Sequence, residues 1–313
     1  MMKIIIAGAG AMGSRFGIML HRGGNDVTLV DGWPAHVDAI RQNGLKANFN
    51  GEDITEHIPV MLPSEVKGNT KADLIILFTK SMQLAKMLQD VKPLIAENTK
   101  ILCLLNGIGH EDTIEKYIPM ENIFIGNTMW TAGLVGPGEV KLFGNGSVEL
   151  QNLGQNQESA AKDLAKVLSE SGLNAKYSDN IHYSIYRKAC VNGTMNCLCS
   201  ILDVNMAEFG ATKPAHDIVV TVVNEFASVA KHEGVDLDVD EVVAHVESCF
   251  DPETIGNHYP SMYQDLIKNN RLTEIDYING AVSRKGKKYQ IPTPYCDLLT
   301  QLIHCKEDIL GAK

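Results

Sequence analysis

The most constraining feature of this sequence is a glycine-rich turn that directly follows its first apolar run. The residues from Lys3 to Ala7 have the pattern of a short strand, and the hexapeptide Gly8-Ala9-Gly10-Ala11-Met12-Gly13 then opens a helical pattern. In this setting Gly-x-Gly-x-x-Gly predicts a dinucleotide-binding site. Gly8 permits a tight turn, Gly10 lets the backbone approach a pyrophosphate, and Gly13 lets helix and strand pack closely.

The start of that helix supplies the second part of the predicted site. The N–H groups of its first turn, at Ala11, Met12 and Gly13, have no acceptor within the helix, and the partial positive charge of the helix end favours an anion there. A purely structural glycine turn is the alternative. We favour dinucleotide binding because strand, turn and helix follow one another in the required order.

An acidic residue stands where a dinucleotide site of this kind needs one. Asp31 follows the predicted strand from Asp26 to Val30, about 20 residues beyond the glycines, where an acid binds the hydroxyls of the adenosine ribose. A solvent-facing acid is the alternative. Gly32, Trp33 and Pro34 supply no cation for a 2′-phosphate. Two like charges about 4 Å apart near a protein surface repel each other by on the order of 4 kcal/mol. Even half of this repulsion between Asp31 and a 2′-phosphate would favour NAD over NADP by roughly tenfold or more.

The first half of the chain alternates apolar strands with helices. Buried strands are predicted at 73–78 and 100–105, with a helix at 82–96 between them. This alternation predicts an α/β Rossmann-type domain with a doubly wound, mostly parallel sheet. Glycine-rich stretches at 133–138 and 144–146 predict antiparallel hairpins that close the domain.

The second half of the chain is dominated by helical patterns. They cover the segments 181–202, 213–233, 238–248, 261–269, 273–285 and 293–309. We therefore predict a Rossmann domain at 1–178 followed by an all-α domain at 179–313, with no internal repeat and no long linker.

Composition and charge narrow the class of protein. The 313 residues are 44% hydrophobic and 21% charged, which is an ordinary globular balance, and their formal net charge is −10. That charge argues against nucleic acid and against an anionic membrane as partners. No signal peptide and no membrane span is recognisable. The seven cysteines lack Cys-x-x-Cys spacing, so we expect reduced thiols in a soluble, cytoplasmic protein. The histidines show no ligand spacing, so we expect no metal.

Polar residues recur on one face of the first helix of the second half. Lys188, Asn192 and Asn196 stand four residues apart in an otherwise apolar segment, so on a regular helix they span about 80° of its face. Asparagine is a poor residue for a helix interior, and buried polar groups need partners. The three residues are therefore predicted to line a ligand cleft. Lys80 and Asn106 follow two core strands, at the strand ends where α/β sheets bind ligands.

Together with two further segments, these residues resemble the ketopantoate reductase family. The matching segments extend over almost the whole chain; they are Gly8 to Gly13, Phe78-Thr79-Lys80, Asn106-Gly107, Arg187-Lys188 with Asn192 and Asn196, Ser261-Met262-Tyr263-Gln264-Asp265, and Thr273-Glu274-Ile275-Asp276-Tyr277-Ile278-Asn279-Gly280. The resemblance implies that the chain moves hydride between a nicotinamide cofactor and the 2-position of a small 2-oxo or 2-hydroxy acid.

The resemblance also implies which residues perform the chemistry. Lys188 would be the general acid that protonates the 2-oxo oxygen, and Glu274 and Asn192 would orient Lys188 and the substrate. Hydride addition develops negative charge on that oxygen, which a positioned ammonium stabilises, and a carboxylate keeps the ammonium charged against desolvation. A surface lysine is the alternative for Lys188. Asp276 and Asn279 are expected to be structural.

Four other residues are assigned to binding by the same resemblance. Ser261 and Asn196 would help to hold the substrate, including its carboxylate. Asn106 and Lys80 would lie near the nicotinamide ribose and the entrance of the active site. Helix capping is the alternative for Ser261, which follows a proline at a predicted helix start. A solvated lysine at a strand end is the alternative for Lys80.

One departure from the family pattern separates two functions. Members of the pantothenate pathway look NADPH-dependent and carry an arginine after the second strand, whereas this chain has Asp31-Gly32. That pair resembles an NAD-dependent D-2-hydroxyacid dehydrogenase branch that includes D-mandelate dehydrogenases. We therefore expect a homodimeric, NADH-dependent enzyme that reduces 2-oxo acids with bulky branched or aromatic side chains to (R)-2-hydroxy acids. The alternatives are an NADPH-dependent 2-dehydropantoate 2-reductase and a non-catalytic Rossmann redox sensor, which would not need Lys188, Asn192, Asn196 and Glu274.

Overall fold

The computed structural model describes all 313 residues and divides into two compact units. Unit 1 consists of residues 1–105 and 110–181, and unit 2 consists of residues 106–109 and 182–313. The division at 181–182 stands beside the boundary proposed from the sequence at 178–179. The short loop 106–109 belongs to unit 2 because its backbone forms a hydrogen bond to that unit. The N–H of Ile108 donates to the carbonyl of Tyr277 at 3.0 Å. None of the helices has the length and apolar character that a bilayer crossing requires.

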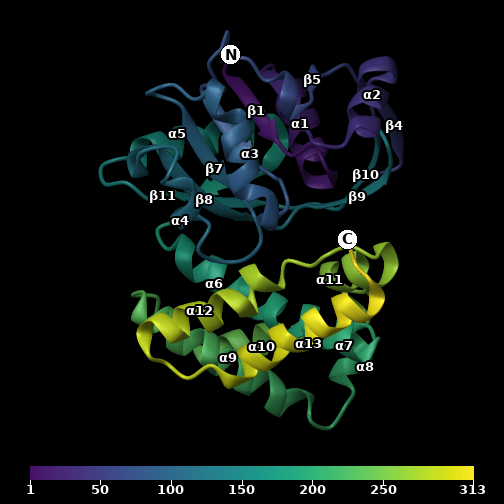
Figure 1. Cartoon of the computed structure of the whole chain (residues 1–313), viewed down its shortest axis with the longest axis vertical. Coiled ribbons are helices and arrows are strands. Elements are labelled where there is room, and N and C mark those ends of the chain that lie inside the picture. The colour runs from purple at the N-terminus through teal and green to yellow at the C-terminus, as the bar shows by residue number, and fades with distance from the viewer. The chain divides into compact units, whose positions relative to one another are not determined.

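Unit 1 is built on an eight-stranded sheet (Figure 1). Its strands are β1 (Lys3–Ala7), β2 (Asp26–Val30), β5 (Val60–Met61), β6 (Leu74–Leu77), β7 (Lys100–Cys103), β8 (Ile123–Thr128), β11 (Val148–Asn152) and β12 (Ala175–Tyr177). Every neighbouring pair is parallel except β8 with β11. Ranked along the chain, the strands from β5 to β8 stand in the order 3-2-1-4-5-6, which is the doubly wound order of dinucleotide-binding domains. The predicted fold class is confirmed.

Helices connect these parallel strands. They are α1 (Ala11–Arg22), α2 (Pro34–Asn43), α3 (Leu84–Val91), α4 (Glu111–Ile114) and α5 (Glu158–Leu168), with the short turns η1 (Pro63–Glu65), η2 (Ser81–Gln83), η3 (Lys92–Leu94), η4 (Met120–Asn122) and η5 (Ser169–Leu173). The single helix predicted at 82–96 is wrong. It is divided into η2, α3 and η3, and α3 ends at Val91 because Pro93 has no N–H to continue the helix.

A second sheet of four strands in unit 1 was not predicted. It consists of β4 (Glu52–Glu56), β3 (Leu45–Phe49), β10 (Glu139–Phe143) and β9 (Thr131–Gly136) in that spatial order, and helix α1 packs against β9 and β10. The hairpin predicted at 133–138 is confirmed by the antiparallel pairing of β9 and β10. The hairpin predicted at 144–146 is wrong, because that stretch leads from β10 to β11, a strand of the other sheet.

Unit 2 is entirely helical, as predicted. Its elements are α6 (Ile181–Val191), η6 (Asn192–Asn196), α7 (Cys197–Leu202), α8 (Met206–Gly210), α9 (Ala215–His232), α10 (Val239–Ser248), α11 (Ser261–Tyr263), η7 (Gln264–Lys268), η8 (Ile275–Tyr277), α12 (Asn279–Tyr289) and α13 (Pro294–Leu310). Helix α9 carries buried Val219, Val222, Val223, Phe226 and Val229 at helical spacing, so it forms the centre of the apolar core.

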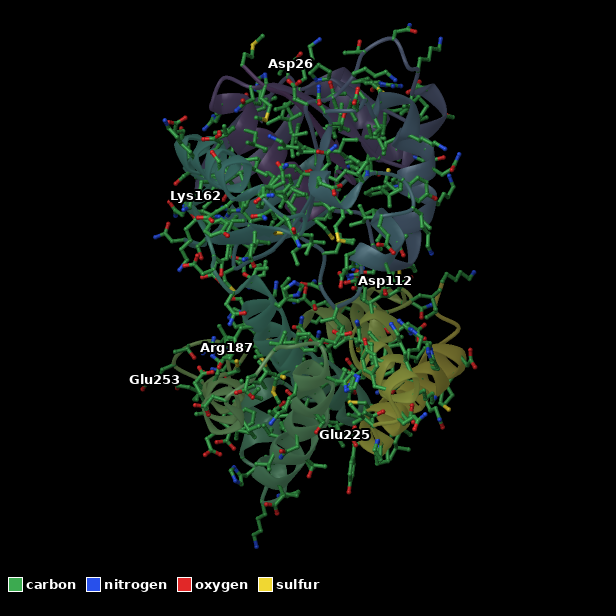
Figure 2. The ribbon with its side chains drawn as sticks, turned by 90° about the vertical axis from the view of Figure 1, so that its left-hand side faces the viewer. Asp26, Asp112, Lys162, Arg187, Glu225 and Glu253 are labelled. Carbon is green, nitrogen blue, oxygen red and sulfur yellow. The ribbon has the colours of Figure 1, made fainter.

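Unit 2 also contains a buried carboxylate that orders the start of its last helix. Glu225 of α9, labelled in Figure 2, accepts hydrogen bonds from the N–H groups of Tyr295 and Cys296 at 2.9 and 2.8 Å. These N–H groups belong to the first turn of α13 and have no acceptor within that helix. A carboxylate from another helix therefore caps α13 and complements its dipole.

Three predicted helices of unit 2 differ in detail from the structure. The segment 181–202 is interrupted by the π-helical turn η6, and 261–269 is a short helix, α11, that continues as the π-helical turn η7. The segment 273–285 begins as the 3₁₀ turn η8, and the α-helix α12 begins only at Asn279. Helical spacing in a sequence reports a buried face, and it does not distinguish the α form from π or 3₁₀ turns.

Candidate active site

The glycine turn after β1 is a place where only glycine fits. Gly8 has φ +100°, and a Cβ built on it would lie 2.5 Å from the backbone N of Thr79. A Cβ on Gly13 would lie 1.8 Å from the carbonyl oxygen of Gly8. The first contact presses the turn against the segment that follows β6, and the second presses α1 against the turn. Both contacts account for the glycines as the sequence predicted.

The first turn of α1 has the features of an anion site. Gly10 precedes the helix without a side-chain cap, and no acidic residue stands in the first turn. A Cβ on Gly10 would meet no atom within 4 Å, so this side of the turn is open. The N–H groups of Ala11, Met12 and Gly13 thus have no capping side chain, and a pyrophosphate fits their charge and hydrogen-bonding needs.

Asp31 is held firmly at the carboxyl end of β2. Its carboxylate accepts hydrogen bonds from the N–H of Ala9 at 2.7 Å and from the N–H of Trp33 at 2.8 Å. Each oxygen has a further acceptor position, so the half-buried carboxylate can still accept the hydroxyls of a ribose. The neighbouring Gly32 is exposed, and a Cβ there would meet nothing within 4 Å.

A buried histidine that the sequence did not single out supports the glycine turn. The Nδ1 atom of His36 accepts the N–H of Gly138 at 2.9 Å, so its Nε2 carries the proton and donates to the carbonyl of Ala9 at 2.9 Å. The hydroxyl of Ser14 donates to the same carbonyl at 2.7 Å. His36 therefore ties the glycine turn to the β9–β10 hairpin, and no pattern in the sequence marks this role.

Lys80 lies where the sequence placed it, at the carboxyl end of β6, which is the neighbour of β1 in the sheet. The chain order of the strands reverses between β1 and β6, and α/β sheets bind ligands at such a point. The half-buried lysine directly follows Thr79, which contacts the glycine turn. Unit 1 therefore brings Lys80, the glycine turn and Asp31 to the carboxyl ends of three adjacent strands.

In unit 2 the structure brings Lys188 of α6 together with Glu274, which precedes η8. Burial lowers the pKa of Lys188 to about 8, and the charge of Glu274 opposes that fall. An ammonium group with such a pKa is charged at neutral pH and can release its proton readily. This combination of burial and one opposite charge is typical of a catalytic acid or base.

Asn192 and Asn196 are the first and last residues of the π turn η6, which directly follows the helix of Lys188. Asn196 is only 4% exposed. A buried carboxamide needs hydrogen-bond partners. The prediction of a regular helix across the three residues is wrong, because the π turn changes the angle between Asn192 and Asn196.

The remaining predicted residues of unit 2 lie on neighbouring elements. A Cβ on Gly107, whose φ is +100°, would lie 2.2 Å from the carbonyl oxygen of Tyr277, so the loop of Asn106 is pressed against the η8 segment that follows Glu274. Ser261 is exposed and is the first residue of α11, and the N-cap position is taken by Pro260 instead of Ser261. Helix α11 packs against η6.

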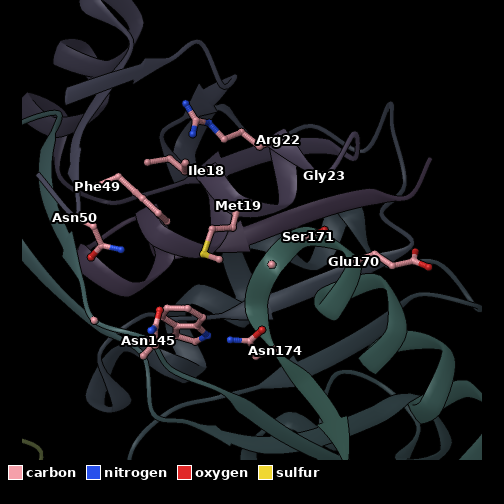
Figure 3. Close-up of a pocket in the computed structure, with 13 residues that line it drawn as sticks. Ile18, Met19, Arg22, Gly23, Phe49, Asn50, Asn145, Glu170, Ser171 and Asn174 are labelled. Carbon is pink, nitrogen blue, oxygen red and sulfur yellow. The ribbon is translucent and has the colours of Figure 1, made fainter. Parts of the chain in front are cut away.

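Unit 1 also contains a cavity of about 480 Å³ away from these residues (Figure 3). It is lined by Ile18, Met19, Arg22, Gly23, Phe49, Asn50, Trp130, Gly144, Asn145, Glu170, Ser171, Gly172 and Asn174. The fully buried guanidinium of Arg15 lies 4.4 Å from the ring centroid of Trp130 and 5.6 Å from that of Phe49. Burial lowers the pKa of Arg15 to about 10, so it stays charged, and the two rings stabilise that charge. No predicted site residue lines this cavity.

Comparison with known proteins identifies the family. The profile of the ketopantoate reductase PanE/ApbA family matches residues 4–155, and that of its C-terminal domain matches residues 180–307. A 2-dehydropantoate 2-reductase of Lactococcus lactis subsp. lactis is 75% identical over 312 residues, which is 100% of both chains. A second, from Streptococcus pyogenes serotype M1, is 48% identical and covers 99% of both chains.

Solved structures give the same result. The ternary structure of a D-mandelate dehydrogenase with NADH and anilino(oxo)acetate superposes with a TM-score of 0.97, at 71% identity and with 100% of both chains covered. A putative 2-dehydropantoate 2-reductase from Enterococcus faecalis superposes with a TM-score of 0.83, at 59% identity and with 100% of both chains covered. The chain therefore belongs to the ketopantoate reductase family and is an oxidoreductase that acts between a keto group and a CH–OH group.

Proposed function

We propose that this protein uses NADH to reduce 2-oxo acids with bulky branched or aromatic side chains to (R)-2-hydroxy acids. The observation that carries the proposal is the carboxylate of Asp31, held by the N–H groups of Ala9 and Trp33 beside an open Gly32. A 2′-phosphate would meet this charge without a cation to balance it. The similarity to a D-mandelate dehydrogenase solved with NADH and anilino(oxo)acetate supports both the cofactor and the substrate class.

In this proposal unit 1 holds the cofactor. The first turn of α1, from Ala11 to Gly13, would bind the pyrophosphate, with Gly8 and Gly10 permitting its close approach. Asp31 would accept the ribose hydroxyls, and Lys80 would lie near the nicotinamide ribose. NADH, when bound, would supply the hydride.

Unit 2 would bind and protonate the substrate. As the carbonyl carbon of the 2-oxo acid becomes a CH–OH carbon, the Nζ of Lys188 gives a proton to the oxygen, and solvent returns a proton to the resulting amine. Glu274 keeps the ammonium charged beforehand. Asn192 would orient the same oxygen, while the carboxamide N–H of Asn196 and the hydroxyl of Ser261 would donate hydrogen bonds to the substrate carboxylate. Asn106, whose loop packs on the η8 segment, would bind at the border of substrate and cofactor.

A second candidate function is NADPH-dependent reduction of 2-dehydropantoate. The observation in its favour is that relatives 75% and 48% identical to the chain carry the name 2-dehydropantoate 2-reductase. In that case the pocket would have to recognise the terminal hydroxyl of ketopantoate, and it would reject analogues that lack this group, because a site built to bond a hydroxyl leaves polar groups unpaired without it.

A matrix of cofactors and substrates separates the two functions. NADH and NADPH are each assayed with ketopantoate, 2-oxoisocaproate, 2-oxoisovalerate and benzoylformate, and products are resolved by chiral chromatography. We expect turnover of several acids with NADH and only (R) products. A missing methylene in an apolar pocket costs about 1–3 kcal/mol, whereas loss of the carboxylate would leave buried polar groups unpaired at about 1–3 kcal/mol each. The side chain should therefore vary while the carboxylate is required.

Three results would contradict the proposal. A kcat/KM for ketopantoate more than about a hundredfold above all other acids would favour the pantothenate reaction, since a single apolar difference does not give that ratio. An (S) product would exclude the proposed binding geometry. Efficient reduction of methyl ketones that lack the carboxylate would show that the substrate is not anchored as we propose.

The surface of unit 2 supports a homodimer. Helix α13 exposes Tyr295, Leu298, Leu302 and Ile309, with exposed fractions of 52, 53, 40 and 82%, and Cys305 is also exposed. These five residues, the α13 stripe, are separated by three and four residues in alternation. This is the spacing of a helix face that pairs with another helix. We propose that a second copy of the chain covers the α13 stripe with its own.

The dimer is tested by placing charge in the α13 stripe. We expect light scattering after size-exclusion chromatography to give twice the 34.2 kDa chain mass for the wild type and the chain mass itself for Leu298→Glu with Leu302→Glu. Carboxylates cannot be buried in an apolar seam without partners. Gln301→Glu adds one carboxylate at an exposed position of α13 outside the stripe and should remain dimeric. A monomeric wild type or a dimeric double variant would refute this assembly.

The state of the cysteines indicates the redox character of the compartment in which the protein is found. All seven cysteines are free, and six of them are buried. Proteins of oxidising compartments commonly use such residues in disulfides. We therefore propose a reducing, cytoplasmic location.

A further inference from the structure

The π turn η6 changes which way Asn196 points. In an α-helix, four residues overshoot one full turn by about 40°. In a π turn the hydrogen bonds reach one residue further, so four residues fall short of a turn. A regular helix would leave Asn196 about 80° from Lys188. The π form of Asn192–Asn196 instead rotates Asn196 back toward the line of Lys188 and Asn192.

A π turn needs side chains to satisfy the carbonyls that it removes from the regular ladder, and this chain provides them. The hydroxyl of Thr194 lies 2.8 Å from the carbonyl of Cys190 and 3.1 Å from that of Val191. The carboxamide nitrogen of Asn279 donates to the carbonyl of Gly193 at 3.0 Å. These two buried side chains therefore stabilise η6 from inside and from the neighbouring helix α12.

Asn279 binds the turn at Gly193 and also binds Cys197, the residue that directly follows the turn. It is fully buried, and besides its bond to Gly193 its carboxamide oxygen accepts the thiol of Cys197 at 3.1 Å. Burial raises the pKa of Cys197, so that thiol stays protonated and remains a donor. The second N–H of the carboxamide faces the sulfur of Cys296 at 3.9 Å. Every hydrogen-bonding group of this side chain thus has a partner within the core.

The opposite side of the turn is confined by packing. A Cβ on Gly193 would lie 2.4 Å from the ring of Phe226 and 3.3 Å from the carboxamide oxygen of Asn279. The turn is therefore pressed between α9 and the first residue of α12, and no side chain larger than hydrogen fits at position 193.

We propose that Asn279 is a positioning residue that holds η6 in its π form and thereby aligns Asn192 and Asn196 with Lys188. Asn279 makes no contact with substrate in this proposal and acts through Asn196. The proposal rests on the proposed function, because it gives Asn196 a role in holding the 2-oxo acid. It adds the requirement that η6 be held in its π form, which the catalytic residues do not ensure by themselves.

The first experiment compares Asn279→Ala and Thr194→Val with the wild type, using whichever 2-oxo acid the wild type reduces best. We expect kcat/KM to fall about tenfold in each, chiefly through a higher KM, as for the loss of one well-aligned hydrogen bond. The Kd for NADH and the pH at which activity declines should stay unchanged. Val282→Ala, a fully buried position on α12 with no polar role, is the matched control for lost stability. If Asn279→Ala does not fold, the kinetics of Thr194→Val test whether the π form of η6 is needed for substrate binding.

A double-mutant cycle with Asn196→Ala tests whether Asn279 influences kcat/KM through Asn196. Residues that act as one unit are strongly non-additive, so removing Asn279 should cost less than about threefold once Asn196 is absent. The same tenfold loss in both backgrounds, or a loss no larger than that of Val282→Ala at equal Tm, would overturn the proposal. Crystal structures of the wild type and of Asn279→Ala show the backbone form of Asn192–Asn196 directly, without the need for an activity assay. If Asn192–Asn196 keeps its π form in the variant, the inference fails even where the proposed function holds. If no 2-oxo acid is reduced, the proposed function fails and loss of the π form still supports the role of Asn279.

Discussion

Lys188→Ala should lower kcat for reduction of a 2-oxo acid by about a hundredfold or more, since general acid catalysis contributes roughly 10²–10⁴. Binding of NADH should barely change, because Lys188 belongs to unit 2 and the glycine turn to unit 1. Steady-state kinetics with a deuteride isotope effect establishes that the chemical step is being measured. A variant that keeps more than about a third of wild-type kcat, with chemistry rate-limiting, would exclude Lys188 as the general acid.

The pH dependence supplies a second measurement on the same residue. Only the ammonium form of Lys188 donates a proton, so kcat/KM for reduction should decline as pH rises through the pKa of about 8. Oxidation of the hydroxy acid needs the neutral amine and should increase over the same range. Glu274→Gln removes the charge that raises this pKa, so the decline should move to lower pH. Arg187→Ala is the matched control, since the neighbouring Arg187 donates to Glu241 at 2.9 Å and has no assigned role in catalysis.

The wild type should prefer NADH over NADPH by about tenfold or more in kcat/KM, and Asp31→Ala with Gly32→Arg should invert that preference. Removal of the carboxylate ends its repulsion of a 2′-phosphate, and the guanidinium supplies a bidentate partner for that phosphate. Position 32 is exposed, and a Cβ there meets nothing within 4 Å, so arginine fits without moving the backbone. The measurement is kcat/KM for both cofactors at one saturating substrate concentration.

Gly32→Arg alone tests the cofactor preference without removing any hydrogen bond of Asp31. Asp31 bonds the N–H groups of Ala9 and Trp33, so Asp31→Ala also loosens the glycine turn and should lower Tm. Gly32→Arg keeps those bonds and should raise kcat/KM for NADPH while leaving Tm unchanged. Asp38→Ala, which removes an exposed acid on α2, controls for net charge. A wild type that prefers NADPH would show that Asp31 does not face the ribose and would favour the pantothenate reaction.

Some features of the fold could be predicted because short stretches of sequence encode them. The alternation of apolar runs and helical spacing predicted the doubly wound sheet and the helical second half, and both are confirmed. The order of strand, glycine turn and helix is encoded locally as well, and the structure has β1, the turn at Gly8 and α1 in that order. The hairpin of β3 and β4 also has a local signal, since Asn50 and Gly51 join the two strands and both have positive φ, the typical turn of a tight hairpin.

Other features depend on partners far away in the chain. The second sheet pairs β3 with β10, strands that are almost a hundred residues apart. His36 supports the glycine turn through Gly138, 102 residues away, and Asn279 bonds Gly193 across 86 residues. Helical spacing predicted that Lys188, Asn192 and Asn196 share a face, but their final directions depend on η6. The sequence by itself therefore determined which residues could form each strand, helix and turn. Only the tertiary structure decided the π form of Asn192–Asn196, because the donor that satisfies the carbonyl of Gly193 comes from a separate helix and is brought there by folding.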